Sequence, residues 1–266
     1  MNLTGDKIPA GFDARYALNV VLPLAEAAYA VMGNPGVDPP LPNGFKKTGL
    51  IAIHQGKKAA YLAQPAKQRS KIAEQALNDP DVFGLVGNNL AAKVAFVSFR
   101  GTVDLVDWEH NLDALYDSYG LVSGAGDVHK GFLSVYDTLR DSVGAALPAA
   151  CQGCDHLLVT GHSLGGAVSV LCAYDLLKNG GFGVTPELYT FAAPRAGAPD
   201  FANHFGQIIQ VCFRVVNFMD VVPQVPTPPL YEHVGTEIPV HGGFRPLDVT
   251  YAHHLTTYLA GLQKLP

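Results

Sequence analysis

Four stretches of the chain are dense in apolar, β-branched and aromatic residues, with little alternation between apolar and polar positions. They cover residues 93–99 (KVAFVSF), 156–160 (HLLVT), 188–192 (LYTFA) and 211–218 (VCFRVVNF). Such runs are typical of strands buried on both faces of a sheet. Segments with helical patterning fall among them, over 131–147, 164–178 and 199–205. The alternation predicts an α/β protein with a mostly parallel central sheet and helices on both faces.

The remaining segments complete this outline. Apolar residues at helical spacing predict further helices over 13–31, 67–77 and about 253–262. The Pro-, Gly- and Asn-rich residues 33–47 predict a loop, and residues 231–240 predict a hairpin or an edge strand. Neither an internal repeat nor a break in composition divides the sequence, so we expect a single domain spanning residues 1–266.

The composition fits a compact globule, since 48% of the 266 residues are hydrophobic and 15% are charged. A formal net charge of -5 gives no electrostatic reason to bind nucleic acid. Residues 17–32 are apolar, but Pro23 and Glu26 interrupt them, so they predict an amphipathic helix and no integral membrane segment. The N-terminus has no recognisable signal peptide. We expect a soluble protein, either cytoplasmic, trimmed of a leader, or exported by a route without an N-terminal mark.

The chain has four cysteines, too few for a disulfide scaffold. Cys172 and Cys212 lie in apolar surroundings and are expected to be buried thiols. Cys151 and Cys154 form a C-x-x-C in an expected loop, which predicts a short local disulfide or two free thiols. Without a second such pair, a zinc site is not expected.

The pentapeptide Gly161-His162-Ser163-Leu164-Gly165 has the G-x-S-x-G pattern of a nucleophilic serine. It lies between an expected strand and an expected helix, where a sharp turn leaves no room for side chains at the glycine positions. The turn would place Ser163 at a helix N-terminus, where backbone N–H groups favour developing negative charge. Because so short a pattern also arises by chance, a structural serine in a Gly-rich turn is the alternative.

A serine hydroxyl needs a general base to act as a nucleophile at neutral pH. In folds with this turn, an acid and then a histidine follow the serine along the chain. Asp220 follows the strand expected over 211–218, so its carboxylate would lie at the carboxyl end of a sheet strand. Four histidines come later and are candidates for the base: His233, His241, His253 and His254.

Several ordered stretches make the pattern more specific. They are residues 99–102 (FRGT), 128–132 (VHKGF), 160–167 (TGHSLGGA), 190–197 (TFAAPRAG), 214–223 (RVVNFMDVVP) and 231–235 (YEHVG). With them the chain resembles the class 3 lipases, the fungal-type triacylglycerol lipases and their bacterial relatives, whereas the first 90 residues match only loosely. The resemblance implies an α/β-hydrolase fold with a lid segment.

The resemblance also implies roles for individual residues. Ser163 would be the nucleophile and Asp220 the acid that orients the base, with the backbone N–H groups of Leu164 and Thr102 forming an oxyanion hole. Residues 253–258 (HHLTTY) match the spacing of bacterial members with His253 as the base. Fungal members place the tyrosine closer to the histidine, which favours His254. We predict His253, with His254 as the alternative base.

In this family the segment after the oxyanion residue forms a lid, here residues 103–126. Read as a helix, it gathers its apolar residues on one face, as a hinged lid requires: Leu105, Trp108, Leu112, Leu115 and Tyr116. A fixed acidic surface helix is the alternative. The acidity of the segment argues mildly against action on anionic membranes.

Three other residues have structural explanations. Arg100 is expected to pair with a carboxylate behind the sheet, His129 to be buried and bonded to backbone, and His162 to pack beneath the serine turn. None of them is expected to take part in the chemistry.

The function implied by the resemblance is that of a serine carboxylester hydrolase, a lipase or esterase without a metal or cofactor. Its substrates would be acylglycerols or similar apolar esters, including lipid at an oil–water interface, cleaved through an acyl-enzyme on Ser163. A feruloyl-type esterase and a phospholipase A1 are alternative enzymes. An inactive relative that binds lipid or a partner protein is the alternative from a different class.

Overall fold

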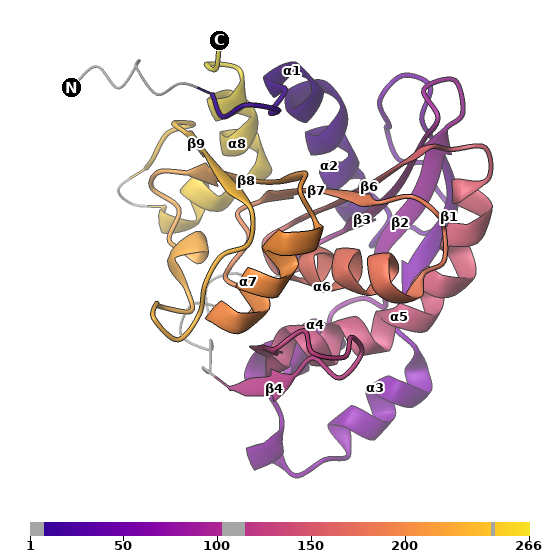
Figure 1. The fold of residues 1–266 in the computed structure, drawn as a ribbon, viewed down its shortest axis with the longest axis vertical. Helices are drawn as coiled ribbons and strands as arrows, with labels where there is room; N and C mark the ends of the chain where they lie inside the picture. The colour runs from indigo at the N-terminus through magenta and orange to yellow at the C-terminus, as the bar shows by residue number, and fades with distance from the viewer. Residues whose placement is uncertain (1–7, 103–114, 246–247) are drawn as a thin grey trace.

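The computed structural model describes residues 8–102, 115–245 and 248–266. Within them, one sheet has the strand order β1-β2-β3-β6-β7-β8-β9 (Figure 1). The strands are β1 (Lys46–Ala52), β2 (Val82–Asn89), β3 (Val94–Phe99), β6 (His156–His162), β7 (Pro186–Phe191), β8 (Cys212–Asn217) and β9 (Thr236–Val240). β3, β6, β7, β8 and β9 run parallel, and β2 is antiparallel to both of its neighbours. The predicted α/β class and mostly parallel sheet are confirmed.

Both faces of the sheet are buried, which explains the unbroken apolar runs in the central strands. Successive residues of a strand point to opposite faces. In β3, Phe96 belongs to one apolar core and Val97 to the other, and in β6 Leu158 and Val159 divide in the same way.

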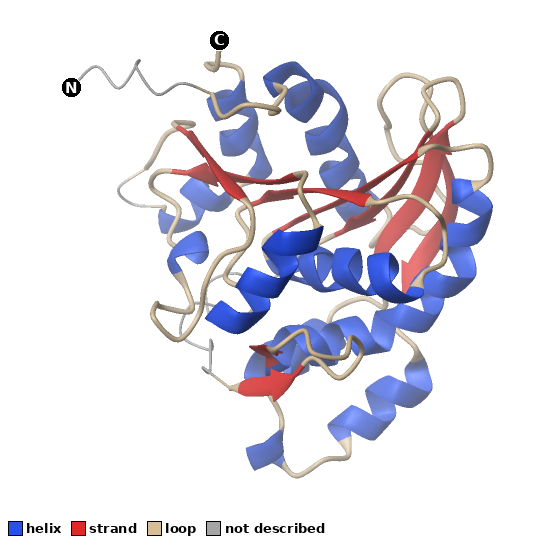
Figure 2. Cartoon of the chain, viewed as in Figure 1, coloured by secondary structure: helices blue, strands red, loops and turns tan. Residues whose placement is uncertain are grey.

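Figure 2 shows helices on both sides of the sheet. One side holds α1 (Ala14–Tyr16), the π-helical turn η1 (Ala17–Val21), α2 (Leu22–Ala30) and α8 (Leu255–Leu262). The other side holds α4 (Lys71–Asn78), α5 (Lys130–Cys151), α6 (Leu164–Asn179) and α7 (Pro199–Ile208), with α3 (Gln55–Leu62) packed against α5. The described residues also form the 3₁₀ turns η2 (Ala66–Gln68), η4 (Val222–Gln224) and η5 (Val249–His253).

The boundaries of several elements differ from the prediction. Strands β1 and β2 were not predicted, and the loop expected over 33–47 ends where β1 begins at Lys46. The helix expected from residue 67 begins at Lys71, because Ser70 is extended, with φ -81° and ψ 133°. α5 continues through Pro148 to Cys151, so Cys151 ends a helix rather than lying in a loop. Both thiols of the C-x-x-C are free.

The lid candidate, residues 103–126, differs from the expected helix in its described part. Leu105, Trp108 and Leu112 lie outside the described residues. β4 (Tyr116–Ser118) is a short strand that pairs antiparallel with β5 (Asp127–His129). The ring of Tyr116 stacks on Tyr231 with centroids 4.6 Å apart, and its hydroxyl donates to the Leu230 carbonyl. The helical prediction is therefore wrong for residues 116–118, because pairing with a later segment overrides the local pattern.

Candidate active site

The carboxyl ends of the parallel strands meet at one edge of the sheet, and the candidate residues follow these ends. Thr102 comes soon after β3, Ser163 directly after β6 and Asp220 soon after β8. Parallel strands in register bring their following loops together at that edge, which is where sites of open α/β sheets form. The topology thus explains how residues more than 100 positions apart reach one place.

The turn at Ser163 is tight and strained. Ser163 has φ 58° and ψ -129°, a conformation rare for residues other than glycine. A Cβ on Gly161 would lie 2.3 Å from the Gly165 carbonyl oxygen, and one on Gly165 would lie 2.4 Å from the Arg100 carbonyl oxygen. The glycines predicted to be necessary for a close turn are therefore required by the backbone packing.

This turn holds the Ser163 hydroxyl at the N-terminus of α6. The Ser163 carbonyl accepts from the N–H groups of Gly166 and Ala167, and the Ser163 N–H donates to the Phe191 carbonyl of β7. Its side-chain Oγ is buried and has no hydrogen-bond partner among the described residues. A buried hydroxyl without a partner is costly in a folded protein, and functional sites are where such costs are retained.

Asp220 and His253 form a buried pair. His253 Nδ1 lies 2.9 Å from Asp220 Oδ2 and 3.0 Å from Oδ1, and both side chains are almost completely buried. Tyr258 of α8 donates its hydroxyl to Asp220 Oδ2 at 2.6 Å, and the Val222 N–H donates to Oδ1 at 3.0 Å. The carboxylate is fully hydrogen-bonded, and it fixes the ring of His253.

The surroundings of Asp220 keep it ionised. Burial by itself would raise the pKa of Asp220, but the His253 imidazole and the hydrogen bonds from His253, Tyr258 and Val222 together hold this pKa below its usual value. Burial, and then the charge of Asp220, raise the pKa of Tyr258 well above its usual range, so its hydroxyl remains a donor. A charged carboxylate next to Nδ1 selects the tautomer in which Nδ1 carries the proton and Nε2 is free to accept one.

The other histidine candidates lie in different surroundings. His254 is exposed, and its Nε2 is 3.4 Å from Thr250 Oγ1. His233 Nε2 lies 2.7 Å from the Pro223 carbonyl, and the exposed His241 ring lies beside Phe218. Among the described residues, His253 is the histidine in hydrogen-bond contact with Asp220.

His253 Nε2, the atom that would take the serine proton, is buried and without a hydrogen-bond partner among the described residues. The structure therefore contains no hydrogen bond between Ser163 Oγ and His253 Nε2. The segment that carries Ser163 nevertheless lies beside His253, because the ring of His162, next to Ser163 in the chain, has its centroid 4.6 Å from that of His253. Catalytic hydrogen bonds are often long without substrate and tighten when it binds.

Thr102 is buried, and the backbone just before it touches the serine turn. A Cβ on Gly101 would lie 2.9 Å from Ser163 Cβ. Leu164 is the first residue of α6 and is also buried. Thr102 and Leu164 thus flank Ser163 from two elements, an arrangement compatible with the oxyanion hole predicted for them.

Two residues that support the pair were given no role from the sequence. Asn217, the last residue of β8, donates to the Ala252 carbonyl at 2.8 Å and accepts from the Gly242 N–H at 3.0 Å, so it holds the loop that carries His253. Tyr258 was noted only for its spacing from His253. The signal for both is their place beside a candidate: Asn217 lies three residues before Asp220, and Tyr258 lies one helical turn after His254.

Arg100, His129 and His162 have the structural surroundings expected of them. Arg100 is completely buried and pairs with Asp79 at 3.3 Å. His129 is buried, and its Nδ1 accepts from the Gly131 N–H at the start of α5. His162 packs beneath the serine turn and bonds to the backbone of His253.

His162 makes the stability of the fold depend on pH. Burial, and then the nearby His253, lower the pKa of His162 to about 3, so the folded protein holds it neutral. In the unfolded chain it binds a proton below pH ~6.5, so stability is lost as the pH falls from that value towards 3. From pH 7 to pH 4.5, we expect this residue alone to reduce the free energy of unfolding by roughly 2–3 kcal/mol.

Urea unfolding at the two pH values measures this loss. His162→Gln should lose less stability than the wild type over this range, whereas His254→Gln, at an exposed position, should follow the wild type. Equal losses in the wild type and His162→Gln would contradict the assignment.

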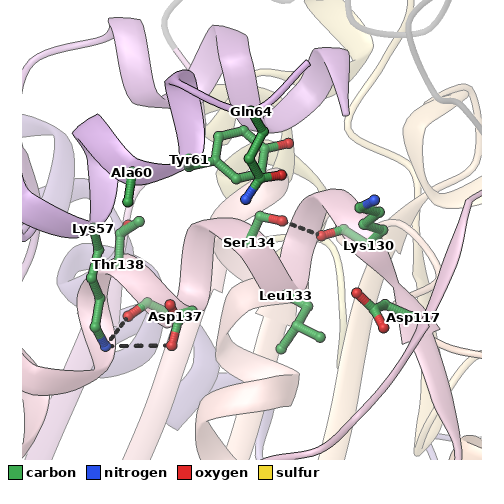
Figure 3. A pocket seen from close by; sticks show the side chains of 10 residues that line it. All are labelled: Lys57, Ala60, Tyr61, Gln64, Asp117, Lys130, Leu133, Ser134, Asp137 and Thr138. Carbon is green, nitrogen blue, oxygen red and sulfur yellow. Dashed lines mark hydrogen bonds and ion pairs between the residues drawn. The ribbon is translucent and has the colours of Figure 1, made fainter. Parts of the chain in front are cut away.

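A separate polar hollow lies between α3 and α5, and none of the candidate residues lines it (Figure 3). Two of the charged groups that line it, Lys57 and Asp137, pair with each other. Lys57 Nζ donates to the carbonyl and to the carboxylate of Asp137, and the Ser134 hydroxyl donates to the Lys130 carbonyl. The chemistry suggested by the sequence therefore concentrates at the sheet edge around Ser163.

Two kinds of feature are absent from residues 8–102, 115–245 and 248–266. No helix in these ranges has the length and apolar character needed to cross a membrane. The same residues contain no cluster of three or more His, Cys, Asp or Glu side chains arranged to hold a metal ion.

Similar proteins cover the region of the site. A "Secreted mono- and diacylglycerol lipase 1" from Fusarium solani is 36% identical over 171 residues, which are 62% of this chain and 49% of that protein. A rice (Oryza sativa subsp. japonica) "Phospholipase A1-II 6" is 33% identical over 204 residues, 62% of this chain and 49% of that protein. A structure of the Rhizomucor miehei lipase propeptide complex is 33% identical, with a TM-score of 0.53 over 59% of this chain and 52% of that one.

The chain therefore spans about half the length of the curated relatives that it matches. These lipase structures and the mostly parallel sheet identify an α/β-hydrolase fold, as predicted. The model of the family "Lipase (class 3)" matches residues 96–229, half of the chain, and this range contains Thr102, Ser163 and Asp220. The chain belongs to the class 3 lipase family.

Proposed function

We propose that this protein is a serine carboxylester hydrolase that cleaves acylglycerols or similar apolar esters through an acyl-enzyme on Ser163. One observation carries the proposal: Ser163 Oγ and His253 Nε2, the two buried side-chain atoms between which a proton would pass, both lack a hydrogen-bond partner among the described residues, while Asp220 anchors the far side of the His253 ring. A protein that only binds lipid has no need of this arrangement.

The reaction follows from these positions. His253 Nε2 takes the proton from the Ser163 hydroxyl as its oxygen attacks the ester carbonyl, and Asp220 stabilises the resulting imidazolium. The backbone N–H groups of Thr102 and Leu164 donate hydrogen bonds to the negatively charged carbonyl oxygen and stabilise it. The proton then passes from His253 to the leaving alcohol. Water, activated by the same histidine, hydrolyses the acyl-enzyme to release the carboxylic acid and regenerate Ser163.

Apolar side chains beside Asp220 support a lipid-like substrate. Phe218 is 68% exposed, and Met219 and Val221 on either side of Asp220 are also exposed. Large apolar residues gathered at the surface next to a site are a feature of surfaces that bind lipid or other apolar partners. The lipase names of the relatives point the same way, whereas the rice relative supports phospholipase A1 as a second candidate.

The test is the hydrolysis rate for p-nitrophenyl esters and triacylglycerols with acyl chains from C2 to C18, below and above the concentration at which they form an emulsion. Each buried CH₂ contributes about 0.8 kcal/mol, so we expect kcat/KM to rise at least roughly tenfold from C2 to C8. Emulsified acylglycerols should be cleaved faster than dissolved ones.

Phosphatidylcholine vesicles provide the comparison for the second candidate. Faster release of fatty acid from these vesicles than from acylglycerol emulsions would favour the phospholipase. Hydrolysis confined to C2–C4 esters would contradict the apolar substrate class, and absence of hydrolysis from every ester would contradict the enzyme itself.

A further inference from the structure

A chain of hydrogen bonds links three parts of the site through residues that have no role in the reaction described above. The Gly101 N–H donates to the Tyr29 hydroxyl at 2.9 Å, and this hydroxyl lies 2.7 Å from His162 Nδ1. On the other side of the same ring, His162 Nε2 lies 2.8 Å from the His253 carbonyl oxygen. The chain therefore runs from the residue before Thr102 to the backbone of His253, passing through the residue before Ser163.

The donors and acceptors along this chain can be assigned. A carbonyl oxygen can only accept, so His162 Nε2 must carry a proton. His162 is neutral because burial, and then its neighbour His253, lower its pKa to about 3, so its Nδ1 has no proton and accepts. The Tyr29 hydroxyl is then the donor to Nδ1, and its oxygen accepts a hydrogen bond from the Gly101 N–H. Each group makes the bond that its chemistry permits, and a single tautomer of His162 satisfies all of them.

Packing also restricts these groups. The Tyr29 ring meets the His162 ring edge-on at 5.8 Å, and the His162 ring contacts those of His253 and Tyr258. At Gly101, a Cβ would lie 2.6 Å from the Tyr29 hydroxyl and 2.9 Å from Ser163 Cβ. Only glycine allows the backbone to approach both groups.

Tyr29 comes from α2, outside the family match over residues 96–229. α2 packs on the face of the sheet opposite α5 and α6, and its buried residues are aliphatic, whereas Tyr29 is partly buried. The helix therefore contributes a polar group at one point, next to the turn before Thr102.

We infer that Tyr29 and His162 are positioning residues for the reaction: their hydrogen bonds hold the Gly101–Thr102 turn and the His253 backbone in register on either side of Ser163. The inference rests on the proposed function, in which Thr102 binds the oxyanion and His253 is the base. An oxyanion donor and a base that shift relative to Ser163 lose transition-state stabilisation even when the substrate still binds.

The test is Tyr29→Phe, which removes the hydroxyl and keeps the ring. The Gly101 N–H and His162 Nδ1 lose their partner, and His162 is no longer confined to one tautomer. On a short soluble ester we expect kcat to fall roughly 10- to 100-fold, the cost of a misplacement of about 1 Å, with KM within about twofold of the wild type. Tyr16→Phe, at a ring that packs against Tyr189, is the matched control and should keep the wild-type kcat.

A spectroscopic measurement separates positioning from general loss of structure. In ¹⁵N-histidine-labelled wild type at neutral pH, the His162 signals should show a protonated Nε2 and an unprotonated Nδ1, and in Tyr29→Phe they should move towards a mixture of tautomers. The double variant Tyr29→Phe with His162→Asn should be no slower than the slower single variant, because both changes break the same chain of bonds.

The outcomes distinguish this inference from the proposed function. An active wild type with an unchanged kcat in Tyr29→Phe would overturn the positioning role and leave the hydrolase intact. A wild type that hydrolyses no ester would overturn the hydrolase, and the His162 signals would still report on the chain of bonds. An Nδ1-protonated His162 in the wild type would overturn the assignment of donors directly.

Discussion

Ser163→Ala is expected to reduce kcat for p-nitrophenyl butyrate by about 10⁴- to 10⁶-fold, the loss found when a serine hydrolase is deprived of its nucleophile. The variant should fold, because alanine replaces a hydroxyl that has no partner among the described residues. Serine and alanine are both strained at the φ of 58° found at position 163, so the change adds no new strain. The loss of rate should therefore come from the chemistry alone.

Ser134→Ala is a suitable control, because it removes a serine hydroxyl that bonds within α5, to the Lys130 carbonyl. It should retain the wild-type rate. A phosphonate that reacts with activated serines should label the wild type at Ser163 and fail to label Ser163→Ala. Retention of the wild-type rate in Ser163→Ala would remove the basis of the proposed reaction.

The centre of the fold could be predicted because its pattern is local. Strands β3, β6, β7 and β8 are buried on both faces, so their residues are apolar regardless of which strand lies beside them. β2 was missed because Gly84, Gly87 and two asparagines interrupt its sequence. The glycines are required by close approach: a Cβ on Gly84 would lie 2.1 Å from the Ser98 carbonyl oxygen on β3. That requirement depends on a neighbouring strand, which the local sequence does not reveal.

In the site, too, the features set by local sequence could be predicted, and those set by contacts between distant residues could not. The serine turn and the acid after β8 are consequences of short segments, and the sequence indicates them directly. The bond from Tyr29 to His162 joins residues 133 positions apart, and the bond from Gly101 to Tyr29 joins residues 72 positions apart. The misassigned residues 116–118 have the same cause, since β5 pairs with them across an intervening loop.

Spacing favoured His253 and left His254 as the alternative base, since both fit a pattern found in the family. Backbone geometry separates them. His253 ends the 3₁₀ turn η5, and His254, with φ -66° and ψ 141°, is the extended residue that caps α8. The change of conformation between them leaves the ring of His253 buried against Asp220 and that of His254 exposed. The final helix thus begins after both histidines, two residues later than expected.

From this geometry we expect opposite effects on kcat when the two histidines are mutated. His253→Ala removes the proton acceptor for Ser163 and leaves the buried Asp220 charge without its partner, so we expect kcat to fall by at least about 10⁴-fold. His254→Ala changes an exposed side chain and should keep kcat within about twofold of the wild type, a surface change away from the chemistry. Thermal unfolding of both variants shows whether lost activity reflects lost structure. Asp220→Asn should resemble His253→Ala in rate, because it permits the wrong tautomer of His253. A fully active His253→Ala together with an inactive His254→Ala would transfer the role of base to His254.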